Sequence, residues 1–422
     1  MKRIKIIGFI LVFLWLTLNS YADTLTLQRC IDMALERSVL SQQQLYNESI
    51  RVLEEKTALS YRMPQLHLQG QAHYQSDVVQ FPGNPVFELP VIPKDQYKAY
   101  IEVMQPLYAG GSIGIKSRLT TMENEIGRKA MEVDLYKVKE AVTALYFGIL
   151  LTEKQASLLK STLEELDRQY QLMVSREKHG VVQRNFLDQF ALQIKKVNGQ
   201  LLEINYKWQS LQAMLSSWTG ITLTSDTMLQ VPGFSEDRGE EVVRPEVEIL
   251  NVRVSYMETL TGIQQAAKKP NLVLFGQGGV GRPNPFNFFE TGTAGFYIVG
   301  LRLNWNIYDY GRVKRALEIT RLKQQNLMTK RDFLSENFSR DYRQNDLETK
   351  KYMALYNNTK ESIELQEQIV KRVKSQLDNG VATTTDYLQE MNTLLQLRLQ
   401  MEIQDVQRYH YYYKSQLSLG TL

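Results

Sequence analysis

A stripe of apolar residues with heptad spacing runs along the stretch from Val138 to Met173. Its members alternate at steps of four and three: Val138, Val142, Leu145, Ile149, Thr152, Ala156, Leu159, Leu163, Leu166, Tyr170 and Met173. This spacing is the a/d pattern of a coiled coil. No proline interrupts residues 111–220, and a helix of about 69 residues would be roughly 100 Å long. The pattern predicts a long helix that turns back near Gly180 and packs against other long helices.

Four shorter segments alternate between apolar and polar residues with a period of two, which is typical of β-strands. They cover about residues 64–76, 97–108, 270–281 and 295–308. Leu66 and Leu68 alternate with glutamine and histidine in the first segment. In the fourth, Leu303 lies between Arg302 and Asn304. The alternation predicts strands with one apolar and one polar face, each long enough to cross a bilayer.

The same order of segments occurs twice, so the chain is predicted to be two tandem repeats. The run from Gln105 to Gly111 is echoed by the run from Trp305 to Gly311, and Gly180–Val181 by Gly380–Val381 at the same offset. The first repeat, residues 23–222, comprises a helix over about 25–61, two strands and a helical hairpin turning at Gly180. Residues 223–243 form a linker. The second repeat, 244–422, has a helix, two strands and a hairpin turning at Gly380.

Residues 1–22 have the pattern of a secretory signal peptide. A positive start precedes an apolar run over residues 6–18, and Ser20-Tyr21-Ala22 predicts cleavage after Ala22. The formal net charge is +4, of which the leader supplies three charges, so the mature chain is near +1. A net charge this close to zero does not indicate a nucleic-acid-binding protein. The single cysteine, Cys30, excludes an intrachain disulfide.

Two classes of protein are compatible with these segments. The mature chain has no apolar run long enough for a membrane helix, and four strands are too few to close a membrane barrel, which needs about eight or more. Several chains could pool their strands into one barrel. Alternatively, the sheet is soluble and the chain is a periplasmic coiled-coil scaffold or adaptor.

The mature chain resembles the TolC-like outer-membrane efflux proteins. The residues that carry the resemblance, in order, are Leu25-Thr26-Leu27, Met63-Pro64-Gln65-Leu66, Gln105 to Gly111, Trp218-Thr219-Gly220, Arg244-Pro245-Glu246 and Leu419 to Leu422. The resemblance implies an α+β membrane protein: a homotrimer whose twelve-stranded β-barrel, four strands per chain, is continuous with a periplasmic α-helical coiled-coil tunnel. It implies an exit duct for tripartite efflux or type I secretion in the outer membrane of a Gram-negative-type cell. The expected partners are outer-membrane lipid, a periplasmic adaptor (membrane fusion) protein and an inner-membrane transporter.

The resemblance also assigns roles to residues at the hairpin turns. Gly180, Val181, Gly380 and Val381 match the motif at which the adaptor docks, although a turn glycine has a local reason of its own, since it ends a helix in the left-handed conformation. Arg302 and Asn304 are expected to face the barrel lumen.

Asp386 matches an aspartate that lines the family's closed periplasmic aperture, where three copies would form a carboxylate ring. The neighbouring family acid is Gln389 here, and the family's tip arginine is Ala382. In the first repeat the corresponding position is Phe186, next to Asn185. We therefore expect Asp386, Gln389, Phe186 and Asn185 at the aperture, with a ring of Phe186 or a ring of Asp386 as its narrowest layer. The alternative is that Asp386 is a solvated residue at a helix start.

Two short motifs resemble enzyme signatures but lack their context. Gly276-x-Gly278-x-x-Gly281 is followed by prolines instead of the helix that a dinucleotide site requires. Gly110-x-Ser112-x-Gly114 has no serine in its repeat copy. The sequence therefore predicts no enzyme activity, catalytic residue, cofactor or metal site.

Overall fold

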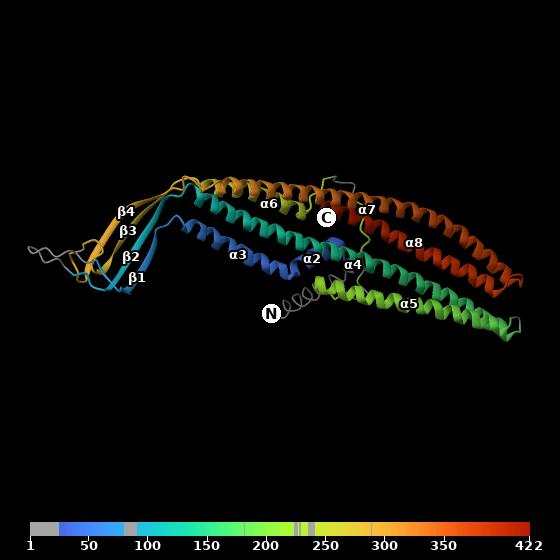
Figure 1. The fold of residues 1–422 in the computed structure, drawn as a ribbon. Coiled ribbons are helices and arrows are strands. Elements are labelled where there is room, and N and C mark those ends of the chain that lie inside the picture. Colours follow the sequence, from blue (N-terminus) through green and yellow to red (C-terminus); the bar gives the residue numbers. More distant parts are fainter. Residues whose placement is uncertain are drawn as a thin grey trace, which may run out of the picture. The chain divides into compact units, whose positions relative to one another are not determined.

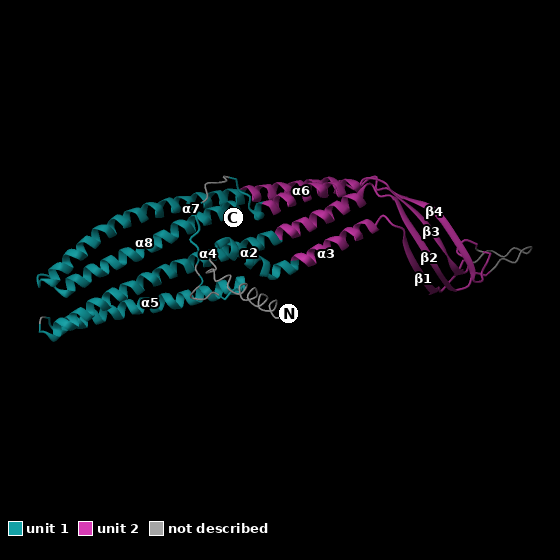
Figure 2. Ribbon diagram, turned by 180° about the vertical axis from the view of Figure 1, so that it is seen from behind, with its two compact units in different colours: residues 1–43, 131–247, 333–422 teal, residues 44–130, 248–332 magenta. Residues whose placement is uncertain are grey.

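The computed structural model describes residues 25–79, 91–180, 182–222, 227, 229–234, 241–287 and 289–422. The predicted signal peptide and Val181 lie outside these residues. The chain forms two compact units (Figure 2). Unit 1 comprises residues 1–43, 131–247 and 333–422, and unit 2 comprises residues 44–130 and 248–332.

The structure is mostly helical, with one four-stranded antiparallel sheet, as predicted (Figure 1). The helices are α2 (Leu27–Arg37), α3 (Val39–Ser60), α4 (Ser112–Lys178), α5 (Arg184–Thr219), α6 (Pro245–Ala266), α7 (Arg312–Asp378) and α8 (Thr384–Leu419). The helices α4 and α7 have 67 residues each, and α5 and α8 have 36 each. In the described part of the chain, no helix is both long and apolar enough to cross a membrane.

Unit 2 contains the sheet, whose strands are β1 (Gln65–Tyr74), β2 (Asp95–Tyr108), β3 (Asn271–Arg282) and β4 (Ala294–Asn304). The strand order is β1-β2-β3-β4, so β1 and β4 are the edges. The fourth strand ends at Asn304, four residues before the predicted end, and β2 begins two residues earlier than predicted.

In unit 1, α5 lies beside α4 and α8 lies beside α7 (Figures 1 and 2). The predicted heptad stripe of α4 is confirmed: eight of its eleven members are buried, and Ala156, Leu163 and Tyr170 are half-buried. The far part of the stripe, including Leu166 and Met173, packs with Phe190 of α5 and Tyr387 of α8 in one core. The stripe therefore packs against helices of both hairpins, α4–α5 and α7–α8.

The N-terminal segment differs from its prediction. A single helix was expected over about residues 25–61, but the chain forms α2 and α3 with a break at Ser38. Ser38 leaves the helical conformation, with a ψ of 133°. Its hydroxyl accepts a hydrogen bond from the Leu40 backbone N–H at 3.2 Å, and this bond starts the next helix.

Candidate functional site

The sheet has a polar face built from alternate residues of all four strands. In register these include Gln69, Tyr100, Gly279 and Phe296 in one row, and His67, Glu102, Gln277 and Ile298 in the next. Glu102 is only 5% exposed. Its carboxylate accepts hydrogen bonds from Gln69 Nε2 at 3.1 Å and Gln277 Nε2 at 2.8 Å. Amides from both neighbouring strands therefore satisfy the carboxylate.

The two residues predicted to line a lumen, Arg302 and Asn304, lie on this polar face. Arg302 pairs with Val273, and its guanidinium carbon lies 4.8 Å from the centre of the Phe275 ring. That ring covers Gly300, where an added Cβ would come within 3.0 Å of it. A cation–π contact with Phe275 therefore holds the Arg302 guanidinium in place. The Phe275 ring can take this position because residue 300 is a glycine.

The opposite face of the sheet is apolar and exposed. Twelve large side chains on it are 38–83% accessible: Leu66, Leu68, Tyr74, Tyr97, Ile101, Val103, Leu274, Val280, Tyr297, Val299, Leu301 and Leu303. They come from every strand. An apolar surface of this extent on a folded protein marks a site that another apolar phase or molecule covers. We call it the apolar face.

The hairpins of unit 1 turn at the two predicted glycines. Gly180 has a φ of +71° and Gly380 a φ of +73°, and an added Cβ would meet nothing within 4 Å at either position. Glycine is therefore required by the left-handed backbone and not by crowding. Val381, beside the second turn, is 77% exposed.

Asp386 is exposed and closes a capping box at the start of α8. Its carboxylate accepts hydrogen bonds from the Thr383 backbone N–H at 2.9 Å and from the Thr383 hydroxyl at 2.7 Å. These bonds lower the pKa of Asp386. In the single chain, Asp386 therefore acts as the helix-start residue that the sequence offered as the alternative to an aperture ring.

The first turns of α5 and α8 lie against each other in unit 1. Thr385 Oγ1 donates to Gln189 Oε1 at 3.4 Å, and the rings of Phe190 and Tyr387 are 6.3 Å apart. This contact brings the predicted aperture residues onto neighbouring turns. Asn185 and Gln389 are exposed there, and Phe186 is half-buried.

An ion pair near the turns was not predicted. Arg176 Nη2 of α4 lies 2.8 Å from Asp378 Oδ1 of α7, so the two hairpins are joined just before each turns back. The sequence signal was weak, because a single basic and a single acidic residue on separate helices have no fixed spacing.

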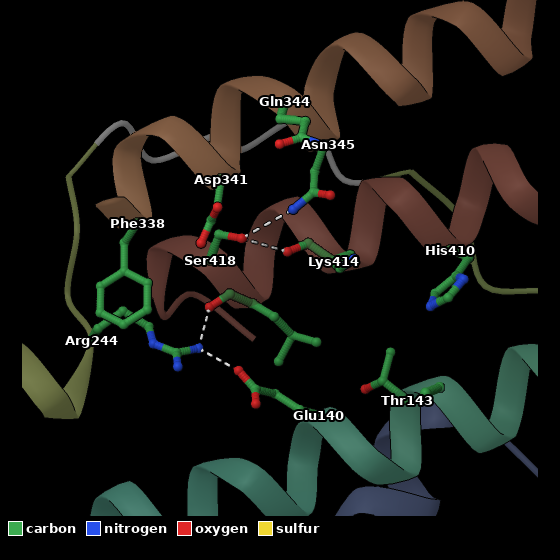
Figure 3. Close-up of a pocket in the computed structure, with 12 residues that line it drawn as sticks. Glu140, Thr143, Arg244, Phe338, Asp341, Gln344, Asn345, His410, Lys414 and Ser418 are labelled. Atoms are coloured by element: carbon green, nitrogen blue, oxygen red, sulfur yellow. Dashed lines mark hydrogen bonds and ion pairs between the residues drawn. The ribbon is translucent and has the colours of Figure 1, made fainter. Parts of the chain in front are cut away.

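A polar cavity of about 450 Å³ lies between α4, α7 and α8 in unit 1 (Figure 3). Arg244, which is 5% exposed, stands at one end between the rings of Tyr136 and Phe338, at 4.1 and 4.4 Å. It forms ion pairs with Glu140 at 2.8 Å and Glu246 at 2.6 Å.

The Arg244 cluster fixes the C-terminal end of α8. Arg244 Nη1 donates to the Leu417 carbonyl at 2.9 Å, and Tyr136 donates to the same carbonyl at 2.9 Å. The Val243 N–H donates to the Leu419 carbonyl at 2.7 Å. Because Arg244 uses its donors within the protein, the cluster is a structural anchor and not a ligand site.

Solved structures with the same fold are outer-membrane proteins, among them two channels. VceC, an outer membrane protein from Vibrio cholerae, has a TM-score of 0.71 and 15% identity over 93% of this chain and 96% of that chain. The MtrE outer membrane channel from Neisseria gonorrhoeae, in its open state, has a TM-score of 0.70 and 15% identity over 93% and 88%. The CmeC outer membrane channel from Campylobacter jejuni has a TM-score of 0.67 and 15% identity over 94% and 84%.

No protein-family model matches the sequence, and no curated protein matches it. At this level of identity the likeness defines the fold. The chain has the fold of the TolC-like outer-membrane channel proteins, over nearly its whole length.

Proposed function

We propose that the chain is a TolC-like outer-membrane channel subunit, three copies of which close one β-barrel of twelve strands. The apolar face of the sheet is the observation that carries this proposal, because lipid would cover it in a barrel. The edges β1 and β4 give a second reason. Unpaired strand edges are not tolerated in lipid, and pairing β4 of one copy with β1 of the next removes them.

In this proposal the helices of unit 1 form a periplasmic tunnel. The helices α4 and α7 have equal lengths, and so do α5 and α8, which supports two tandem repeats. Each repeat would contribute an equivalent helical hairpin to the tunnel wall. A signal peptide over residues 1–22, cleaved after Ala22, would deliver the chain to the periplasm.

The hairpin turns are the proposed docking sites for a periplasmic adaptor. The exposed backbone turns at Gly180 and Gly380, with Val181 and Val381, would lie at the tunnel's distal end. The adaptor would couple the duct to an inner-membrane transporter, as in tripartite efflux or type I secretion. The duct performs no chemistry of its own, so the partner transporter supplies the energy.

The aperture of the proposed tunnel lies at the first turns of α5 and α8. Asp386 and Gln389 on one helix and Asn185 and Phe186 on the other would surround the axis in three copies. The contact between Thr385 and Gln189 supports this grouping, because it holds the two turns together within one chain. Arg302 and Asn304 would line the barrel lumen.

The second candidate function, a periplasmic scaffold or adaptor with a soluble β-domain, explains the apolar face less well. A soluble sheet exposes its polar face and buries its apolar one, and here the apolar face is the more exposed.

Ion conductance tests the proposal. Purified protein added to a planar lipid bilayer is expected to produce discrete, uniform current steps, and outer-membrane fractions should release it only with detergent. Recovery of the folded protein in the soluble periplasmic fraction, with no current steps, would favour the scaffold instead.

A further inference from the structure

A second cavity, of about 360 Å³, lies within unit 2 where the sheet meets the helices. Its walls include the end of the polar face nearest the helices. Met104, Pro106 and Val273 of that face line the cavity together with the polar Gln65 and Asn271. Ile113 of α4 and Ile263 of α6 complete an apolar wall. The volume falls in the range of small-molecule sites, about 300–1,000 Å³.

Lys116 is the charged side chain among the described residues that line this cavity. Its Nζ lies 4.0 Å from the centre of the Tyr61 ring, which also lines the cavity. A cation–π contact of this kind holds the ammonium in place and leaves its positive charge unneutralised.

A cavity with mostly apolar walls and one lysine ammonium among them is complementary to one class of ligand. Apolar walls favour a hydrocarbon chain or ring system, and the ammonium favours a carboxylate, sulfate or phosphate group at the end of it. A lipophilic cation would meet the same walls but would be repelled by Lys116.

We propose that this cavity binds anionic amphiphiles from the side of the polar face, as exported substrates in passage. The inference rests on the proposed channel, in which the polar face borders the lumen. A bilayer lipid would have to reach the cavity from the apolar face, on the other side of the sheet. The cavity would hold the apolar part of a substrate at the point where the helices give way to strands.

Binding can be measured on the purified protein transferred to a non-ionic amphipol, so that neither free detergent nor an anionic polymer competes. A dansyl-labelled undecanoate serves as the fluorescent probe, displaced by dodecanoate or by dodecyltrimethylammonium. The wild type is expected to bind dodecanoate at least about tenfold more tightly than dodecyltrimethylammonium, the effect of one charge-assisted contact. K116Q is expected to weaken dodecanoate binding about tenfold, and K116E to reverse the preference between the two ligands.

Lys314, an exposed lysine of α7 in the same unit, gives the matched control. K314Q should bind like the wild type. Equal affinity for the two ligands, or equal effects of K116Q and K314Q, would overturn the site. The reversal by K116E requires a folded protein, so it separates loss of the site from loss of the fold.

A second readout tests the direction of access. Dodecanoate at its binding concentration should reduce the current through wild-type channels in a planar bilayer and leave K116Q channels unchanged. Binding without Lys116-dependent block would overturn the claim that the cavity opens to the lumen. A protein that binds dodecanoate through Lys116 but forms no channel would contradict the proposed function and leave the binding chemistry standing.

Discussion

At the scale of single residues, His410 of α8 is a partly buried histidine packed on an aromatic ring. Its ring stacks on Phe147 of α4 with the centres 5.3 Å apart. Burial, with a smaller effect from the Lys414 charge, lowers the pKa of His410 to about 4. The imidazole is therefore neutral in the folded chain at pH 5, where an unfolded chain would hold it protonated.

This difference predicts a pH-dependent stability. The unfolded chain binds the extra proton, so the free energy of unfolding should fall as pH drops from about 6.5 to about 4, by up to about 3 kcal/mol. H410F keeps the stack with Phe147 and removes the titrating group. Guanidinium titrations at pH 7 and pH 4.5 should show a smaller loss for H410F than for the wild type. The same loss in both proteins would contradict a role for His410.

Asp386 can be assigned to a helix cap or to an aperture ring by comparing two substitutions. T383V removes the capping hydroxyl and keeps the carboxylate, whereas D386N removes the charge. A ring of three carboxylates predicts that block of the channel by trivalent cations weakens several-fold in D386N and persists in T383V. A cap alone predicts faster amide exchange at the start of α8 in both variants, with block unchanged in both.

The helix cap and the aperture ring would shift the pKa of Asp386 in opposite directions. The Thr383 hydrogen bonds lower the pKa of Asp386, so its capping contribution is present above the ordinary carboxyl range and is lost as pH falls through the depressed value. Repulsion among three carboxylates would act in the opposite direction and raise a pKa. Block that survives to low pH would show that the cap dominates.

At the scale of elements, the strand β4 gives the sharpest contrast between the two faces of the sheet. Val299, near the middle of the strand, is 70% exposed on the apolar face, and Ile298 lies on the polar face opposite Gln277. V299R should destabilise the barrel by about 2–4 kcal/mol, because it places a charge at mid-membrane. I298R should be tolerated and should change the ion selectivity. Refolding midpoints in lipid measure both, and equal destabilisation would show that β4 does not face lipid.

The hydrophobic periodicity of the sequence predicted the secondary structure correctly where one face of the helix or strand is apolar along its whole length. The heptad stripe of α4 reappears as buried residues from Val138 to Met173, since one face of a long helix must pack. The alternation in β4 predicted the faces of Leu303 and Arg302 for the same reason. The break at Ser38 was missed because no proline or glycine marks it, and a local hydroxyl contact decides it.

Pairings between distant residues could not be predicted. Glu102 falls at a polar position of the alternation over residues 97–108, but its partners Gln69 and Gln277 are 33 and 175 residues away. Arg176 and Asp378 are 202 residues apart. Such contacts depend on strand register and helix rotation, which the composition of either segment does not specify. The roles of Asp386 and Phe186 at an aperture remain a proposal for the same reason, because three copies would have to meet.

At the scale of the whole molecule, the proposed function requires that one chain is incomplete. Its sheet has two open edges and one apolar face, and its two hairpins have matching lengths. Each feature has a use in a closed assembly of three copies. A single copy would expose the apolar face and both strand edges.

The number of chains in the detergent-extracted protein therefore tests the central claim most directly. Light scattering that separates protein from detergent mass should give three chains per particle, and circular dichroism of the same particle should show both helix and strand. A stable particle of one chain, with its strand content intact, would contradict the account, because a four-stranded sheet would then stand alone.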